Sequence, residues 1–218
     1  MRLVSVNTGG PREVIGLDGR AVLTSIWKSP RDGRVAVRTL NLDGDEQSDL
    51  SAHGGQYKAV YCYPSEHYEW WKRQLPDLDL PWGVFGENLT TAGLGEAGVQ
   101  IGDRFAIGTA VFQVTQPRQP CFKLGIRFSR ADMVKRFVES GRSGFYVSVV
   151  REGEIGAGDP IHLVERARES LPVSEIFALH FDHESTRDRL ERAAAIERLS
   201  PGWRDNFRKR SQELSGIQ

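Results

Sequence analysis

Short runs of apolar and β-branched residues, separated by glycine turns, constrain the fold of this chain more than any other feature. Up to about Val164 these runs are too short for typical helices. The expected strands cover residues 2–6, 21–27, 35–40, 58–63, 99–107, 110–115, 145–150 and 161–164. The dipeptides Asp18-Gly19, Asp32-Gly33 and Gly108-Thr109 lie between neighbouring runs and predict hairpins. Many short strands with few helices favour a closed or nearly closed β-barrel over alternating strand–helix units.

Helices are expected at two places inside this β-rich part and in a tail after it. Ser65 is a candidate N-cap for a helix over 66–75, and Gly141 ends a second apolar-periodic segment over 131–140. After about Arg166 three helices are predicted, over 173–181, 186–199 and 201–214. The sequence therefore predicts a barrel domain over 1–165 and a small three-helix subdomain over 166–218. This tail packs either on the barrel or on a partner subunit, which leaves a homodimer open.

The charge balance and the cysteine content exclude several classes of protein. The 218 residues contain 29 Lys plus Arg and 29 Asp plus Glu, so no net field attracts a nucleic acid polymer. Two cysteines cannot form a disulfide framework of the secreted kind. The chain shows neither a signal-peptide pattern nor an apolar run of membrane-spanning length. We expect a soluble cytoplasmic protein without a membrane partner.

One cysteine lies in an unusual setting. Cys121, in the segment TQPRQPCFKLG, follows two prolines and has Arg118 and Lys123 close by in sequence. Positive charge favours a thiolate, which is a soft metal ligand, a nucleophile or a persulfide carrier. The alternative is an unreactive, partly buried thiol. Cys62, in the expected strand KAVYCY, is interpreted as a core residue that points away from Tyr61 and Tyr63.

A histidine and two glycines precede that strand, in the segment LSAHGGQYK. Gly54 and Gly55 allow the backbone to approach a ligand closely, and Lys58 adds a point charge. His53 and these three residues are therefore candidates for an anion-binding loop. The alternative is a histidine in an ordinary glycine turn.

Two further polar positions are candidates. Glu87 and Asn88 lie in the glycine-rich segment WGVFGENLTTAGL, where Glu87 is a candidate proton donor and Asn88 a candidate for binding a heterocycle edge. A solvent-exposed turn is equally consistent. Arg142, in SGRSGFY, is a candidate phosphate clamp or, alternatively, a cap at a helix C-terminus. The sequence contains no CxxC, HExxH, GxSxG or Walker motif.

The ordered set HGG, GEN and QPRQPC, followed by GRSGFYVSVV, resembles the MOSC domain family, which is named after the C-terminal domain of molybdenum cofactor sulfurases. The match is to its YiiM-like branch, which is linked to resistance against 6-hydroxylaminopurine. The resemblance extends over nearly the whole chain, including the three-helix tail. It implies a mainly β fold, with a MOSC-type β-barrel that holds the molybdenum cofactor, a pterin dithiolene bearing a phosphate.

The resemblance also implies roles for single residues. Cys121 occupies the position of the family's cysteine and would ligate molybdenum, with His53 and Glu87 as candidate catalytic proton donors. The candidate cofactor contacts are Gly54, Gly55, Lys58, Asn88, Arg118, Lys123 and Arg142. If these assignments hold, Cys121, His53 and Arg118 should converge on one cavity.

The implied activity is reduction of N-hydroxylated bases to amines, which would detoxify them. Because no flavin or nicotinamide motif is recognisable, the electrons would come from a separate flavodoxin or flavoprotein reductase. Binding of pyridoxal phosphate is not expected. Two alternatives stay open at this point: a persulfide carrier that uses Cys121, and a non-catalytic barrel that binds the cofactor or another anion.

Overall fold

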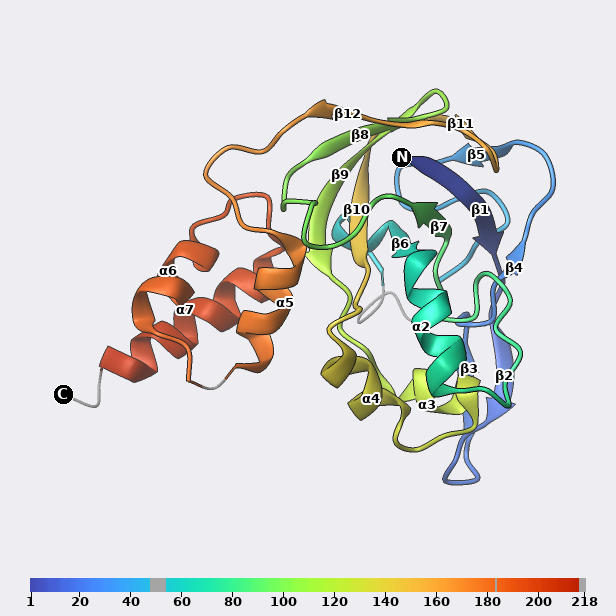
Figure 1. The fold of residues 1–218 in the computed structure, drawn as a ribbon, viewed down its shortest axis with the longest axis horizontal. Helices are drawn as coiled ribbons and strands as arrows, with labels where there is room; N and C mark the ends of the chain where they lie inside the picture. The colour runs from blue at the N-terminus through green and yellow to red at the C-terminus, as the bar shows by residue number, and fades with distance from the viewer. Residues whose placement is uncertain (48–53, 183, 216–218) are drawn as a thin grey trace.

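An eight-stranded mixed sheet forms the centre of the molecule (Figure 1). The computed structural model describes residues 1–47, 54–182 and 184–215. The strand order is β12 (Ile161–Glu165), β8 (Arg104–Ile107), β9 (Ala110–Pro117), β10 (Phe145–Arg151), β6 (Val60–Pro64), β7 (Leu89–Ala92), β1 (Arg2–Thr8) and β4 (Ser29–Pro30). Neighbouring strands run antiparallel except β6 and β7, which are parallel.

Two small two-stranded sheets flank the central one. In the first, β2 (Arg12–Ile15) pairs with β3 (Ala21–Thr24), and the predicted turn at Asp18-Gly19 joins them. In the second, β5 (Val35–Val37) pairs with β11 (Gly153–Ile155). The hairpin at Gly108-Thr109 is confirmed, because β8 and β9 pair on either side of it. The hairpin at Asp32-Gly33 is wrong, since β4 pairs with β1 and β5 with β11.

Of the expected closed or nearly closed barrel, closure is wrong, because the described strands form an open sheet that ends at β12 and β4. One end strand, β4, is two residues long and contains Pro30, which has no N–H to donate to a further strand. The other, β12, is mostly exposed. The segment ahead of β12 approaches the start of β1 through the isolated bridge between Arg2 and Pro160 and through hydrogen bonds between Leu3 and residues 158–159, but these contacts form no ladder between β12 and β4. The fold is therefore a mixed sheet with helices.

Six α-helices occur in the described part of the chain, so helices are not confined to a three-helix appendage. They are α2 (Glu66–Gln74), α3 (Phe122–Phe128), α4 (Met133–Ser140), α5 (Val173–Phe181), α6 (Arg187–Ala194) and α7 (Pro201–Ser215), with a 3₁₀ turn η1 (Gln56–Lys58). The sequence does not predict α3. Its central Gly125 is a poor helix former, but a Cβ there would lie 2.9 Å from the Arg130 carbonyl oxygen, so this helix needs a glycine at that point. None of the described helices combines the length and apolar character that crossing a bilayer requires.

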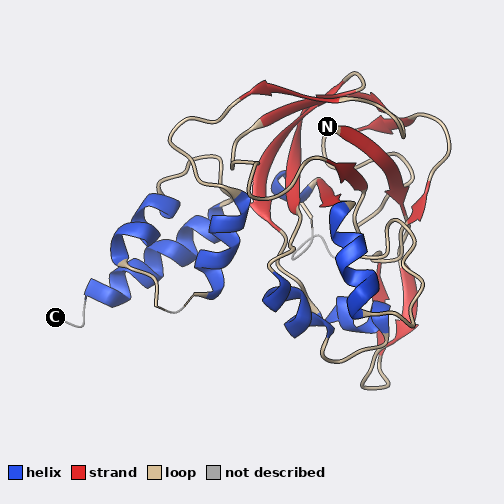
Figure 2. Cartoon of the chain, in the orientation of Figure 1, coloured by secondary structure: helices blue, strands red, loops and turns tan. Residues whose placement is uncertain are grey.

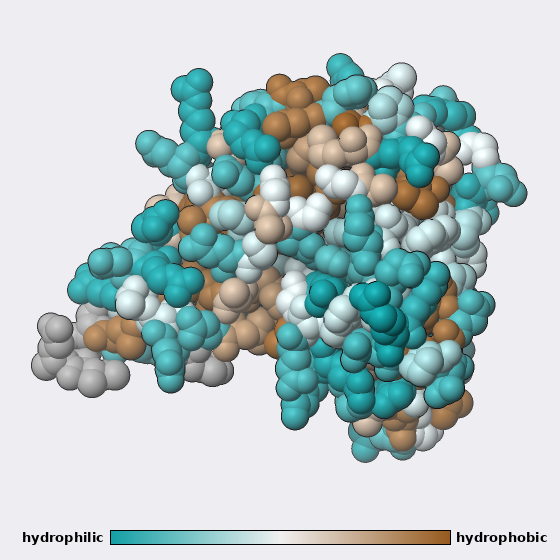
Figure 3. Space-filling view, in the orientation of Figure 1, coloured by the Kyte–Doolittle hydropathy of each residue, from teal (hydrophilic) through white to brown (hydrophobic). Residues whose placement is uncertain are grey.

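The helices form two groups, the tail helices α5 to α7 beside the sheet and α2 to α4 at its other end (Figure 2). The tail shares one hydrophobic cluster with the sheet, in which Ile176, Leu190 and Phe207 pack with strand residues such as Phe112. Hydrophilic residues cover most of the outer tail surface on the face in Figure 3. The tail is therefore packed onto the sheet of its own chain, which was one of the two expected arrangements.

A second cluster, rich in aromatic side chains, lies on the other side of β6. Tyr61 and Tyr63 point into this cluster with Trp71 and Phe137, whereas Cys62 points into the first cluster with the sheet core. The interpretation of Cys62 as a core residue is confirmed, and its burial raises the pKa of the thiol. One member of the aromatic cluster, Tyr61, also lines a cavity.

Candidate functional site

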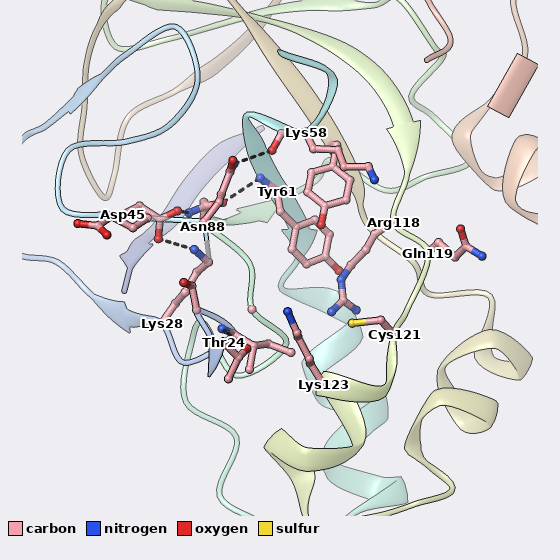
Figure 4. Close-up of a pocket in the computed structure, with 16 residues that line it drawn as sticks. Thr24, Lys28, Asp45, Lys58, Tyr61, Asn88, Arg118, Gln119, Cys121 and Lys123 are labelled. Carbon is pink, nitrogen blue, oxygen red and sulfur yellow. Dashed lines mark hydrogen bonds and ion pairs between the residues drawn. The ribbon is translucent and has the colours of Figure 1, made fainter. Parts of the chain in front are cut away.

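The C-terminal end of β9 leads directly into a cavity of about 640 Å³, including the space open to solvent (Figure 4). Five of the predicted site residues lie on its wall: Lys58, Asn88, Arg118, Cys121 and Lys123. They come from η1, from the segment before β7, from the turn after β9 and from α3. The convergence of Cys121 and Arg118 on one cavity is confirmed. His53 lies outside the described residues.

Arg118 is held in place from two sides. Its guanidinium lies over the rings of Tyr61 and Phe137, 5.0 and 5.1 Å from the ring centroids, and its backbone N–H donates to the Gly144 carbonyl at 3.3 Å. Although the side chain is only 5% exposed, Nη1 has no hydrogen-bond partner among the described residues. Figure 4 shows the guanidinium directed toward the Cys121 sulfur. The fold therefore presents a buried cation with an unused donor beside a partly exposed thiol.

The opposite wall contains a neutralised ion pair. Lys28 pairs with Asp45, and both side chains are almost completely buried. Burial lowers the pKa of Lys28, and the attraction of Asp45 opposes this shift. The second carboxylate oxygen of Asp45 accepts a hydrogen bond from Asn88 Nδ2 at 2.9 Å. This pair adds no net charge to the cavity, so its net charge depends on the other ionisable groups on the wall.

Asn88 connects this ion pair to the sheet. Its Oδ1 accepts a hydrogen bond from the Tyr61 backbone N–H at 3.0 Å, while Nδ2 donates to Asp45 and, at 3.3 Å, to the Asn7 carbonyl. Both ends of the amide are thus engaged within the protein. Asn88 lines the cavity, but its contacts are those of a residue that holds three chain segments together.

The remaining cations lie on the same side as the thiol. Lys123 is 9% exposed and belongs to α3, and Lys58 follows the glycine pair. Gly54 and Gly55 line an adjoining second cavity, which shares Lys58 and Cys121 with the first. Together with Arg118, these lysines make the Cys121 side of the cavity positively charged. Among the described lining residues, the carboxylate of Glu46 partly offsets this charge.

Glu87 does not lie on the cavity wall. Its neighbours Gly86 and Asn88 line the cavity, whereas the Glu87 carboxylate turns away from it and contacts Tyr68 of the aromatic cluster. Its Oε1 accepts hydrogen bonds from the Tyr68 hydroxyl, from the Gly83 N–H at 2.8 Å and from Thr90 Oγ1 at 2.9 Å. Glu87 is fully buried, and burial raises its pKa although these hydrogen bonds favour the charged form.

This raised pKa gives the stability of the protein a testable pH dependence. Above the ordinary value of 4.5 the unfolded state releases the Glu87 proton before the folded state does, so stability due to this group falls as the pH rises. We expect the unfolding free energy of wild type, relative to Glu87→Gln, to be highest near pH 4 and to decline toward pH 8, with a slope of at most about 1.4 kcal/mol per pH unit. Urea unfolding across this range measures it. Glu197→Gln, which removes an exposed carboxylate, is the control, and a pH-independent difference for Glu87→Gln contradicts the expectation.

Arg142 is also absent from the residues that line the cavity beside Cys121. Its Nη1 donates to the Ser140 carbonyl at 2.9 Å, and its guanidinium lies 4.2 Å from the centroid of the Trp70 ring. Because Ser140 ends α4, these contacts match the alternative interpretation of a cap at a helix C-terminus. The structure thus separates Arg142 from the other candidate cofactor contacts.

Sequence reasoning missed several residues on the wall, above all Lys28, Asp45, Tyr61, Gln119 and Tyr146. Lys28 and Asp45 come from loops 17 residues apart with no shared motif. Their pairing depends on the tertiary structure, and no local pattern indicates it. The tyrosines lie on strands β6 and β10, whose residues pair directly as Tyr146 with Tyr61.

Two models of known protein families match this chain, and one of them covers most of the cavity wall. The family model for the MOSC domain matches residues 49–162, and the model for the YiiM-like 3-alpha helix domain matches residues 171–212. The first match contains Cys121, Arg118, Lys58 and Lys123 of the cavity lining. The chain belongs to the MOSC domain family, in its YiiM-like branch.

Individual members of the MOSC family agree with this placement. The protein YflK of Bacillus subtilis (strain 168) is 38% identical over 216 residues, which is 99% of this chain and 97% of that protein. YiiM of Escherichia coli (strain K12) is 36% identical and covers 88% of this chain and 86% of its own length. The crystal structure of YiiM from Geobacillus stearothermophilus superposes with a TM-score of 0.81 at 35% identity, covering 96% of this chain and 98% of that one.

A third MOSC relative has an activity in its name. A protein of Gibberella moniliformis (strain M3125 / FGSC 7600) named "Reductase" is 38% identical over 154 residues. The match covers 69% of this chain and only 27% of the fungal protein. This chain is thus similar to about a quarter of a larger protein whose name is "Reductase".

Proposed function

We propose that this chain is a molybdenum-cofactor-dependent reductase of N-hydroxylated compounds, such as a hydroxylamino base that is converted to its amine. The observation that supports this most directly is that the Cys121 thiol shares one cavity wall with the buried Arg118 guanidinium, whose Nη1 has no hydrogen-bond partner among the described residues. Membership of the MOSC family and a relative named "Reductase" support the same class of reaction.

The residues present fit a bound molybdenum cofactor. A pterin dithiolene that bears a phosphate is anionic, and Arg118, Lys58 and Lys123 place three cations on the wall around Cys121. Arg118 Nη1 is a donor that lacks an acceptor among the described residues, so an anionic ligand would satisfy it. A thiolate is a soft ligand that suits molybdenum.

The proposed reaction breaks one N–O bond. R–NHOH takes up two electrons and two protons and gives R–NH₂ and water. The cofactor, when bound, supplies the two-electron redox chemistry. The chain's own residues hold the anion, orient the substrate next to Cys121 and deliver protons. Besides Lys28, which is paired with Asp45, the ammonium groups of Lys58 and Lys123 lie on the described wall and are the proposed proton donors, because Glu87 points away from it. A separate flavodoxin or flavoprotein reductase is the proposed source of the electrons.

The direct test measures both cofactor content and turnover. We expect the chain, expressed in a host that makes the cofactor, to contain molybdenum and pterin in about equal amounts. With a flavoprotein or a chemical donor such as reduced methyl viologen, it should convert 6-hydroxylaminopurine to adenine with two electrons per product. A folded wild-type protein that contains neither molybdenum nor pterin overturns the proposal.

The same experiment separates the alternatives. A removable sulfur atom on Cys121, detected by mass spectrometry of the intact protein without bound molybdenum, would make the chain a persulfide carrier. Retention of molybdenum and pterin without turnover by any competent donor would make it a cofactor-binding protein. Either outcome contradicts the reductase assignment.

A further inference from the structure

A second cavity lies beside the first, between the sheet and the helical tail. It shares Lys58, Gln119, Cys121 and Tyr146 with the first cavity, and the space it encloses, including the part open to solvent, is about 1510 Å³. One wall is formed by Ser200, which precedes α7, and by the first two turns of α7, through Gly202, Trp203 and Asn206. We call it the tail cavity. Cys121 thus lies where the two cavities meet.

The wall contributed by α7 is fixed relative to the sheet. Trp203 is 6% exposed and belongs to the hydrophobic cluster that contains the sheet core. The start of the tail is attached by backbone hydrogen bonds, from the Val173 N–H to the Val99 carbonyl at 2.9 Å and from the Ile101 N–H to the Leu171 carbonyl at 3.1 Å. The tail cavity is therefore a consequence of core packing rather than of a loosely attached tail.

Two carboxamides in this cavity have oxygen atoms without partners. Gln116, on β9, is 2% exposed, and its Oε1 has no hydrogen-bond partner among the described residues. The same holds for the buried Oδ1 of Asn206, which lies one turn after Trp203 on the same face of α7. A buried acceptor without a partner costs about 1–3 kcal/mol, so such atoms are rarely left unused. Their position on a cavity wall indicates a ligand that donates hydrogen bonds.

The rest of the wall indicates the shape of that ligand. Tyr57, Tyr146, His180 and Trp203 supply aromatic surface. The His180 and Trp203 rings adjoin, with centroids 4.5 Å apart and planes tilted by 44°, so they form a bent aromatic face. Aromatic faces bind planar rings by stacking, and the carboxamides of Asn and Gln pair with the edge of a nitrogen heterocycle.

We propose that the tail cavity is a binding subsite for a planar nitrogen heterocycle, whose N–H groups donate to Gln116 and Asn206 while its ring lies against the aromatic face. The three-helix tail thereby supplies part of the specificity of the site. The statement that this heterocycle is the substrate rests on the proposed function, because it places the ring next to Cys121. The binding itself does not depend on that function.

Binding of adenine to the full chain tests the subsite without any turnover. We expect isothermal titration calorimetry to detect adenine binding to wild type, and Asn206→Ala and Gln116→Met to raise the dissociation constant about tenfold each, which corresponds to about 1.4 kcal/mol for one lost hydrogen bond. Gln212→Ala removes a carboxamide from the exposed side of the same helix and should leave binding unchanged.

A blocking variant provides an independent measurement. Nothing lies within 4 Å of the position that a Cβ would take at Gly202, so Gly202→Phe should fill part of the cavity without a clash in the fold. We expect this variant to lose adenine binding and keep its unfolding temperature. In a functional enzyme, Asn206→Ala should raise the KM for 6-hydroxylaminopurine about tenfold and leave the reduction of hydroxylamine, which has no ring, unchanged.

The outcomes for the subsite and for the function are separate. Absence of adenine binding to wild type, or equal binding by all variants, overturns the subsite. Adenine binding that is sensitive to these variants, in a protein that contains no molybdenum and reduces no N-hydroxylated compound, keeps the subsite and overturns the proposed function. If the protein reduces 6-hydroxylaminopurine and the KM is unchanged in Asn206→Ala and Gln116→Met, the proposed function is kept and the subsite is overturned.

Discussion

Cys121→Ser is expected to lower the rate of 6-hydroxylaminopurine reduction by at least about 10³-fold, because loss of a metal ligand removes several kcal/mol of transition-state stabilisation. Serine has nearly the same size, but its hydroxyl does not ionise near neutral pH and is a hard ligand. Because Cys121 is partly exposed in the cavity, the unfolding free energy should change little. Metal analysis, turnover with a chemical electron donor and urea unfolding measure the three effects.

Cys62→Ala is the matched control for this experiment. It also removes one thiol, but from the sheet core, where Cys62 is 2% exposed. We expect it to lower the unfolding free energy by about 1 kcal/mol and to leave molybdenum content and turnover unchanged. Equal loss of molybdenum in both cysteine variants, or full activity of Cys121→Ser, contradicts the assignment of Cys121 as the metal ligand.

Gly144→Ala is expected to lower the unfolding free energy by about 3–5 kcal/mol, because two separate problems arise at this position. Gly144 has a φ of +59°, and a Cβ there would lie 2.4 Å from the Cys62 carbonyl oxygen and 2.8 Å from the rings of Tyr61 and Tyr63. Its N–H also donates to Glu96 Oε1 at 2.7 Å, so the segment cannot move away without losing a hydrogen bond to a buried carboxylate. Denaturant unfolding measures the change.

This substitution should also affect the site. The Gly144 carbonyl accepts the backbone hydrogen bond of Arg118, so a shift of this segment displaces the buried guanidinium. We therefore expect Gly144→Ala to retain less molybdenum even in the fraction that folds.

Gly141→Ala separates backbone strain from steric clash. Gly141 has a similar φ of +65°, but nothing lies within 4 Å of its Cβ position. We expect this variant to lose only about 1–2 kcal/mol, the penalty for a side chain in the left-handed region. A loss as large as that of Gly144→Ala would mean that the clash with the strand and the tyrosine rings is not the cause.

The local pattern of the chain predicts most of the individual elements. Apolar runs bounded by glycine turns predict β1, β6, β9 and β10, and capping residues predict α2 and α4. The local pattern does not predict α3, because Gly125 lowers the helix propensity of this segment. A glycine is needed there because the backbone of Arg130 leaves no room for a side chain. The pattern fails again at Asp32-Gly33, because the partners of β4 and β5 are strands far away in sequence. Local patterns describe turns and periodicity, but they do not specify which strands pair.

The same limit applies to the candidate site. Motifs in distant parts of the chain correctly indicate that Lys58, Asn88 and Cys121 share a cavity, while the roles of the residues on its wall stay predictions. Glu87 and Asn88 are adjacent in the sequence, but only Asn88 lines the cavity, because the turn before β7 directs the Glu87 carboxylate to Tyr68. Arg142 is adjacent to the glycines of its motif but contacts the end of α4 and Trp70.

The sequence by itself determined that the chain is rich in short strands, that three helices follow them, and that one cysteine lies in a stiff basic segment. Only the tertiary structure decided that the sheet stays open, that Lys28 neutralises Asp45, and that α7 closes a second cavity next to Cys121. The physical reason is that these features depend on contacts between residues far apart in the chain. Propensity and periodicity act over a few residues, whereas packing of the tail onto the sheet brings Gln116 and Asn206 to one cavity.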